Sequence, residues 1–246
     1  VPTTAGTGSE VTPIAILSDT EQKLKKGLVS SRIIPKVALL DPTLTVNLPA
    51  EVTAFTGMDA LTHAIEAFTS KKATDYTDML ALKAVALIGG NICTAFHDGA
   101  DLAARQNMLI GSLLAGMAFA NAGVGGVHAL AYPLGGMFHV PHGLANSVLL
   151  ADTMAYNAQA CERRYRELGA VLLSLPVESV SAEMVLAAVR RLCRDLEIPS
   201  GLAALGVPAA AVNDMARAAM LVTRLLVNNP REITVVEARQ IYQHAY

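Results

Sequence analysis

Four side chains in the sequence have the types and the spacing of a metal-binding site. Asp59 and His63 stand four residues apart in GMDALTHAIEAF, and on a helix this spacing places both on one face. His128 and His142 have Pro133, Gly135 and Gly136 between them, so a helix that stops there and folds back can bring both imidazoles to one point. Three imidazole nitrogens and one carboxylate oxygen suit Fe(II) or Zn(II) rather than Mg or Ca. With only four protein ligands, a position can stay open for a substrate oxygen.

Each of these patterns also has an ordinary structural interpretation. An Asp and a His four residues apart on an apolar helix can be a satisfied polar pair, and the spacing of His139 and His142 is equally weak evidence. The distribution of the histidines favours a metal, because four of the six fall within GMDALTHAIEAF and VHALAYPLGGMFHVPHG. His97 and His244 lie in polar surroundings and are predicted to be surface residues.

The composition limits the classes of protein to which the chain can belong. Of its 246 residues 52% are hydrophobic and 16% charged, which predicts an ample core and argues against disorder. The net charge of −2 without a basic run argues against nucleic acid as a partner. Apolar runs are interrupted before ~20 residues, so we expect no membrane span. Three cysteines without CxxC spacing predict free thiols in a reducing compartment, which is the cytoplasm.

The chain is predicted to change character at Pro49. Before it, VTPIAIL, KKGLVS and PKVALLDP have the pattern of short strands. Pro49 fits the first turn of a helix, with Asn47 as its cap, and glycines 123, 125 and 126 allow a sharp entry to the helix of His128. Ser181 and Thr234 are predicted N-caps. Apolar periodicity predicts helices over about 56–70, 75–96, 101–120, 142–160, 160–173, 181–196, 207–227 and 235–245.

Four segments, in this order, resemble the iron-containing (group III) alcohol dehydrogenase family. They are PTTAGTGSEVTPIAIL, GMDALTHAIEA, VHALAYPLGGMFHVPHGLANSVLL and LLVNNPREITVVEARQIY, and the resemblance extends over nearly the whole chain. The family holds its metal by the Asp and His of DxxxH, the His of VHA and the His of PHG, which implies Asp59, His63, His128 and His142. The resemblance further implies Fe(2+) or Zn(2+), a nicotinamide cofactor (NAD or NADP), and hydride transfer between this cofactor and a small alcohol or aldehyde.

The resemblance also implies a mainly α fold. Residues 49–246 would form an all-helical, dehydroquinate synthase-like metal-binding domain, and residues 1–48 a β remnant of an α/β dinucleotide-binding domain. The family's glycine-serine-rich pyrophosphate loop is missing from this sequence, which opens within a motif and without Met, so we expect a fragment that is inactive by itself. We also expect a homo-oligomer, a dimer or higher. Strands without their sheet would leave apolar residues uncovered, namely Ile14, Ile16, Val37 and Leu39.

Further site residues are predicted in the opening loop and around the later histidines. The small and hydroxyl residues of TTAGTGSE can approach a phosphate or ribose, although the loop is neither a P-loop nor GxGxxG. The resemblance places Thr3, Thr4 and Thr7 at the cofactor, together with Lys25, which can equally be a solvated strand charge. His139 is expected to face the cleft, as is its neighbour Phe138.

Tyr132 departs from the commonest family pattern, which has a second His four residues after the first. A phenol can donate and accept a hydrogen bond, but its reference pKa is near ~10. Tyr132 is therefore either a catalytic residue in proton transfer or a helix residue whose hydroxyl faces the cleft or solvent.

Other functions stay open at this stage. Hydroxyacid-oxoacid transhydrogenases and maleylacetate reductases belong to the same superfamily, although the latter usually alter the histidine set. The missing pyrophosphate loop favours a non-catalytic helical remnant that binds a metal or a partner.

Overall fold

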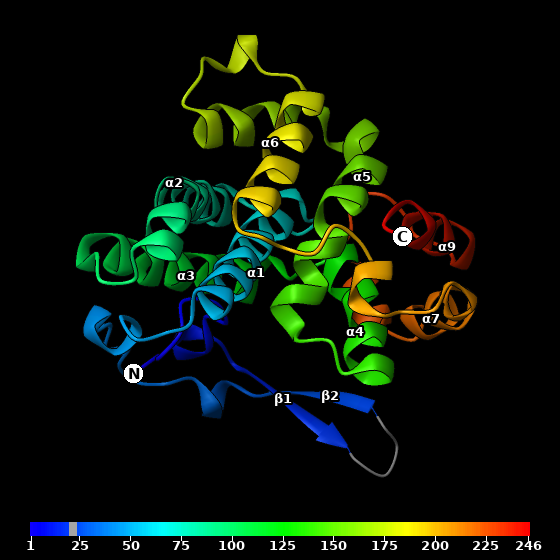
Figure 1. Cartoon of the computed structure of the whole chain (residues 1–246), viewed down its shortest axis with the longest axis horizontal. Helices are drawn as coiled ribbons and strands as arrows, with labels where there is room; N and C mark the ends of the chain where they lie inside the picture. The colour runs from blue at the N-terminus through cyan, green and yellow to red at the C-terminus, as the bar shows by residue number, and fades with distance from the viewer. Residues whose placement is uncertain (20–23) are drawn as a thin grey trace.

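The computed structural model describes the backbone of residues 1–19 and 24–246, and the side chains of residues 1–17 and 27–246. A short antiparallel hairpin precedes a body built of helices (Figure 1). The hairpin strands are β1 (Ile14–Asp19) and β2 (Leu24–Val29). The helices are α1 (Ala50–Thr69), α2 (Asp75–His97), α3 (Leu102–Ala122), α4 (Gly126–Phe138), α5 (His142–Leu173), α6 (Ala182–Asp195), α7 (Val212–Ala219), α8 (Thr223–Leu226) and α9 (Val235–His244).

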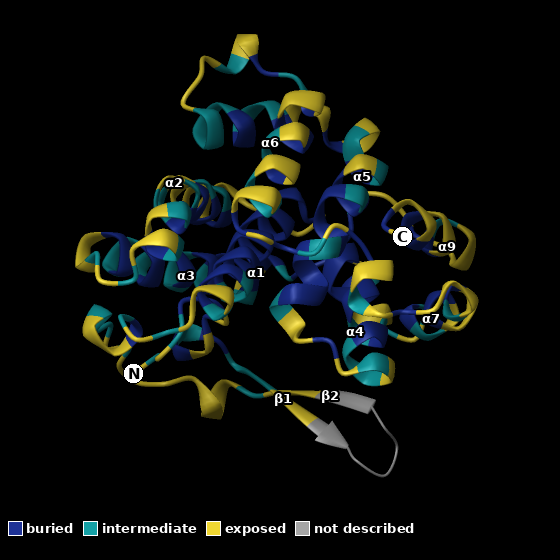
Figure 2. Ribbon diagram, in the orientation of Figure 1, coloured by how far each residue is buried: buried dark blue, intermediate teal, exposed yellow. Residues whose placement is uncertain are grey.

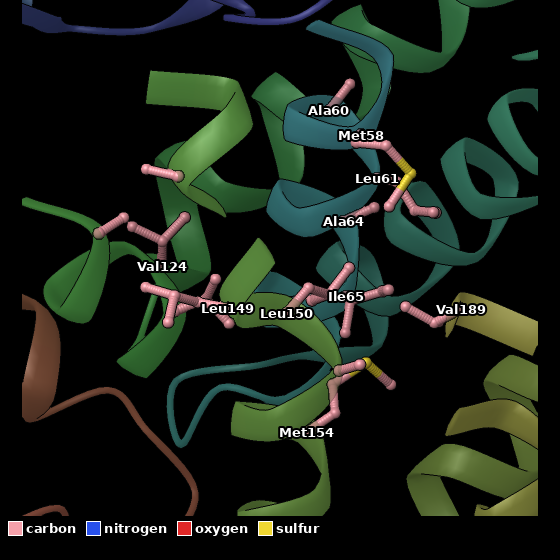
Figure 3. Close-up of a cluster of buried hydrophobic side chains, with 14 of the residues drawn as sticks. Met58, Ala60, Leu61, Ala64, Ile65, Val124, Leu149, Leu150, Met154 and Val189 are labelled. Carbon is pink, nitrogen blue, oxygen red and sulfur yellow. The ribbon is translucent and has the colours of Figure 1, made fainter. Parts of the chain in front are cut away.

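Helix α1 lies at the centre of the fold. Every residue from 57 to 70 is buried, and α2, α3 and α5 pack around the helix. Figure 2 shows the same burial along the inner side of α5. In Figure 3, Ile65 of α1 lies next to Leu150 of α5, and both belong to the same buried apolar cluster as Leu61 and Met154. Because residues 57–70 of α1 are buried on all sides, the polar side chains in this part of the helix lie in the protein interior.

Two glycines let other segments approach α1 closely, just before Asp59. A Cβ at Gly143, in the first turn of α5, would lie 2.3 Å from the carbonyl oxygen of Phe55. A Cβ at Gly6, in the opening loop, would lie 2.7 Å from Cβ of Thr56. Both contacts require glycine, and they bring α5 and the opening loop to the same turn of α1.

Helix α4 is joined to α3 and to α5 by short connections, and the chain changes direction at both. It begins three residues after Gly123 (φ 77°), which is the C-cap of α3, and the two helix axes differ by 104°. Its C-cap, His139, has φ 57°, and α5 then begins at His142. A reversal between His128 and His142 is therefore confirmed, but its predicted place is wrong, because α4 continues through Pro133, Gly135 and Gly136 and the chain turns at residues 139–141. The buried hydroxyl of Tyr242 in α9 donates to the carbonyl of Leu130 at 2.6 Å and holds α4 in place.

The first 48 residues differ from the prediction in one strand. β1 and β2 pair with Ile14 opposite Val29, but residues 35–41 form no strand, because no neighbouring strand lies beside them in the described part of the chain. The expected exposure of apolar residues is confirmed for Ile16, Val37 and Leu39, whereas Ile14 is half-buried against the core.

The helix boundaries also required corrections. Asn47 is not a cap, since Pro49 occupies the N-cap of α1 and the helix runs unbroken from Ala50. Helix α5 continues through residue 160, where every residue is compatible with a helix. The helix predicted over 207–227 is divided into α7 and α8, at the β-branched pair Val222 and Thr223, whose side chains disfavour helix. Ser181 and Thr234 are N-caps, as predicted.

By length and composition, α2 could cross a membrane, and α3 with α4 meets the same criterion as a bent pair. A core helix also meets it, and the buried side of α2, which includes Leu80, Val85 and Ile88, belongs to the core that α1 and α3 share. The absence of a membrane span therefore stays a prediction. The three cysteines are free thiols, as expected.

Candidate metal centre

Three of the four predicted ligands converge on one point. Asp59 comes from α1, His128 from α4 and His142 from the first residue of α5, and one donor atom of each lies within 4.8 Å of the others. The Nε2 atoms of His128 and His142 are 3.7 Å and 3.8 Å from Oδ1 of Asp59. Asp59 and His128 are buried, whereas the side chain of His142 is 48% exposed. The group is therefore accessible from the side of His142.

Asn146 lies in the middle of this group and shows what would fit there. Its Nδ2 is 2.6 Å from Oδ1 of Asp59, 3.1 Å from Nε2 of His128 and 3.2 Å from Nε2 of His142. An amide has two hydrogens for these three acceptors, and its Oδ1 is buried without a partner among the described residues. A single divalent cation can satisfy all three acceptors at once, and this donor set fits Fe(2+) or Zn(2+).

His63 lies one helical turn after Asp59, beside the converging atoms but not among them. Its Nδ1 is 3.2 Å from the carbonyl oxygen of Gly6. A carbonyl only accepts, so Nδ1 carries the proton and Nε2 carries the lone pair that a metal needs. The ring stacks between Phe119 (centroids 4.3 Å apart) and His128 (4.6 Å). The role of His63 as a fourth ligand stays a prediction. The opening loop, through the carbonyl of Gly6, sets the tautomer of the His63 ring.

Glu66 is a residue of the site that the sequence did not predict. Its Oε2 lies 2.5 Å from Nδ1 of His128, and its Oε1 accepts the backbone N–H of Val127 at 2.6 Å. His128 therefore carries its proton on Nδ1 and presents Nε2 to the centre. The one signal in the sequence is an acid within the apolar run of GMDALTHAIEAF, because a buried acid needs partners.

The electrostatics of α1 favour an ionised Asp59 beside a neutral His63. Burial alone would raise the pKa of Asp59, but the neighbouring imidazoles and the amide of Asn146 outweigh it and hold this pKa below its ordinary value. Burial lowers the pKa of His63 to about 3, despite the nearby Asp59. Burial also acts to lower the pKa of His128, but Glu66 and Asp59 outweigh it and raise the pKa. The centre thus contains one fixed negative charge and one imidazole that resists protonation.

The pKa of His63 predicts how the stability of the metal-free protein changes in acid. Between about pH 6.5 and pH 3 the unfolded chain binds a proton at residue 63 that the folded protein does not. The free energy of unfolding therefore falls with falling pH, by up to about 1.4 kcal/mol per pH unit from this residue. The raised pKa of His128 has the opposite effect on the free energy of unfolding. The stabilisation from His128 is fully present below about pH 6.5, the ordinary pKa of the unfolded chain, and is lost as the pH rises through the pKa of His128 in the folded protein.

Urea unfolding of metal-free wild type and His63→Asn at pH 7 and at pH 4.5 measures this effect. The variant should be less stable at pH 7, because the ring stacking is lost, yet it should lose less stability between the two pH values. Equal losses in both proteins would show that His63 is not buried in its neutral form.

A cleft of ≈ 1180 Å³ extends from the metal centre towards the hairpin. Of the predicted cofactor residues, Thr7 lines it, together with Ser9 and Thr12, whereas Thr3 and Thr4 do not. The side chain of Lys25 lies outside the described residues. Besides the residues of the metal centre, the polar side chains that line the cleft include those of Tyr132, His139 and Arg224. Phe138, expected to line the cleft beside His139, packs against the core instead.

Tyr132 lies at the edge of the metal centre. Its ring is edge-on to that of His142, with centroids 6.3 Å apart. Burial raises the pKa of Tyr132, and a hydrogen bond and the charge of Arg224 offset this only in part. The residue is therefore a neutral phenol at pH 7. Arg224 was missed in the sequence because an arginine in a predicted helix is normally a surface residue.

Comparisons with known proteins agree with this architecture. Residues 53–246 match the profile of the Fe-containing alcohol dehydrogenase family, C-terminal, and residues 1–42 match that of iron-containing alcohol dehydrogenase. The chain therefore belongs to the iron-containing alcohol dehydrogenase family.

Individual relatives are similar over the whole chain. It is 42% identical to long-chain-alcohol dehydrogenase 1 of Geobacillus thermodenitrificans and 44% identical to 1,3-propanediol dehydrogenase of Klebsiella pneumoniae. The alignments cover 100% of this chain but 62% and 64% of those proteins. The crystal structure of a 1,3-propanediol oxidoreductase superimposes with a TM-score of 0.94 at 43% identity, over 99% of this chain and 64% of that one. The chain thus spans less than two thirds of the length of these relatives.

Proposed function

We propose that this chain is the metal-binding part of an oxidoreductase that transfers a hydride between an alcohol or aldehyde and a nicotinamide cofactor. The observation that carries the proposal is the convergence of Asp59, His128 and His142 at one end of a large cleft. Fe(2+) or Zn(2+) bound there supplies a Lewis acid for the substrate oxygen. The relatives, which include alcohol and propanediol dehydrogenases, support this reaction class.

The residues of the chain have separate roles in the proposal. Asp59, His63, His128 and His142 hold the ion, and Asp59 contributes the negative charge. Tyr132 donates or accepts a hydrogen bond at the reacting end of the cleft, because its phenol stays neutral and lies beside His142. His139, which also lines the cleft, is assigned to the same end as a second polar group.

The cofactor is assigned to the hairpin side of the cleft. Thr7 lines this side and is the contact that the cleft supports. Thr3 and Thr4, which do not line the cleft, and Lys25 stay proposed contacts on the family resemblance alone. A related structure, sulfoacetaldehyde reductase of Bifidobacterium kashiwanohense, was solved in complex with NAD+ and superimposes with a TM-score of 0.90 at 32% identity, over 99% of this chain and 63% of that one. We therefore assign NAD or NADP to this side of the cleft. A cytoplasmic location and a homo-oligomer complete the proposal, on the cysteine usage and the family resemblance. Residues 1–48 belong to the cofactor domain and residues 49–246 to the metal domain.

The test joins this chain to the N-terminal third of the Klebsiella pneumoniae 1,3-propanediol dehydrogenase. With a simple primary alcohol and NAD or NADP, the chimera should show turnover that requires added Fe(2+) or Zn(2+) and that Asp59→Asn abolishes. The 246-residue chain alone should bind the metal and show negligible turnover, since hydride transfer needs a positioned nicotinamide. A folded, metal-loaded chimera without hydride transfer would contradict the proposed function.

A further inference from the structure

The first turn of α4, which carries His128, is held by side chains from three distant parts of the chain. Glu66 of α1 uses both carboxylate oxygens: Oε1 accepts the backbone N–H of Val127 at 2.6 Å, and Oε2 accepts Nδ1–H of His128 at 2.5 Å. Its side chain is 6% exposed. Since the first N–H groups of a helix have no partner within the helix, Glu66 both caps α4 and binds the imidazole that follows.

Asn229 completes the same turn from the C-terminal end of the chain. Its Oδ1 accepts the backbone N–H of Gly126 at 3.1 Å. Asn157 of α5 fixes the orientation of this amide, because the two side chains exchange hydrogen bonds of 3.0 Å and 2.8 Å. The glycine at 126 is required for this approach, since a Cβ there would lie 2.9 Å from Oδ1 of Asn229. The turn before His128 is therefore fixed at both of its first two N–H groups.

We propose that Glu66 is a positioning residue of the metal centre, which holds His128 in the tautomer that exposes Nε2 and fixes the turn of α4 that carries it. The inference deepens the proposed function and rests on the role of His128 as a ligand. A ligating histidine commonly donates its second N–H to a carboxylate, which sets the ring orientation and raises its basicity. Glu66 goes further, because the same carboxylate also binds the backbone one residue earlier.

Replacing Glu66 by glutamine separates this role from simple packing. Glutamine has the same shape, but it offers one accepting oxygen and one donating NH₂ group. If its oxygen accepts from Val127, its NH₂ faces Nδ1 of His128, and the imidazole must move its proton to Nε2. If the amide is turned round, two donors face each other at Val127. In neither arrangement can both hydrogen bonds of the wild type be kept.

The experiment measures the tautomer of His128 in the metal-free chain by ¹⁵N-histidine NMR at alkaline pH, in the range where the ring signals no longer change with pH. Wild type should show Nδ1–H at His128, and Glu66→Gln should show Nε2–H. The affinity of the chain for Zn(2+) should fall 10- to 100-fold in this variant, in the range known for outer partners of metal ligands. Glu51→Gln, an exposed position on the same helix, is the control and should change neither quantity.

Two further variants keep the proposal testable if Glu66→Gln does not fold. Glu66→Asp retains a carboxylate and should retain Nδ1–H. Asn229→Asp places a carboxylate against the carbonyl groups of Asn157 and Arg231, which Nδ2 of Asn229 contacts, and should lower stability while leaving the tautomer unchanged. Wild type with Nε2–H, or a folded Glu66→Gln that keeps both Nδ1–H and the wild-type affinity for Zn(2+), would overturn the inference. If Asp59→Asn binds Zn(2+) as tightly as wild type, the proposed function is overturned instead. The two failures can be told apart, because the tautomer of His128 is measured without metal.

Discussion

The Asp59→Asn variant should bind Zn(2+) or Fe(2+) at least ~100-fold more weakly than wild type, a difference of about 2.7 kcal/mol. Asp59 is the one carboxylate among the three converging donors, so the substitution removes the negative charge of the site. The oxygen of the new amide can still accept the hydrogen bond from Asn146 that Oδ1 of Asp59 accepts at 2.6 Å. The fold should therefore be retained, and isothermal titration with each metal measures the loss.

The matched control is Asp98→Asn. Asp98 is exposed at the C-cap of α2, and its Oδ1 accepts the backbone N–H of Ala100, which an asparagine oxygen can also do. The control should bind metal as wild type does. Equal affinities in wild type and Asp59→Asn would mean that the ion binds elsewhere on the protein.

The Gly143→Ala variant should lose about 3 kcal/mol of unfolding free energy, through overpacking of a well-filled interior. The new Cβ would lie 2.3 Å from the carbonyl oxygen and 2.8 Å from the carbonyl carbon of Phe55. Both are backbone atoms of α1, so no flexible side chain can move away. The start of α5 must shift, and His142 moves with it away from Asp59, so metal affinity should fall as well.

Gly90→Ala provides the control for this substitution. Gly90 lies in α2, where a Cβ would meet nothing within 4 Å, and alanine in a helix interior is favoured over glycine by up to ~1 kcal/mol. Urea unfolding should therefore show a small gain for Gly90→Ala and a large loss for Gly143→Ala. Similar effects at the two positions would argue against the close contact between α5 and α1.

The parts of the site that the sequence predicted are those set by local geometry. Asp59 and His63 share a helix, so their spacing alone places them together. The reversal between His128 and His142 was predicted from Pro133, Gly135 and Gly136, but these residues lie inside α4, and the chain turns at residues 139–141 instead. Both predictions needed only residues close in the chain.

The parts that the sequence did not predict depend on contacts between distant segments. Glu66 and His128 are 62 residues apart, and Asn229 and Gly126 are 103 apart, and no pattern within either segment indicates its partner. Asn146 is an ordinary polar residue of a helix until α1 and α4 surround it. The failed strand at 35–41 has the same cause, since a strand forms only where another strand can pair with it.

The central claim is that Asp59, His63, His128 and His142 bind one divalent ion. The most direct test is anomalous X-ray diffraction from crystals of the chain loaded with Zn(2+), with data collected on both sides of the zinc edge. The account predicts one strong peak per chain, within roughly 2.0–2.2 Å of a carboxylate oxygen of Asp59 and of Nε2 of each histidine. His63 must approach the other three for this to hold. A fully occupied peak at another place, or one bonded to none of these four side chains, would contradict the account.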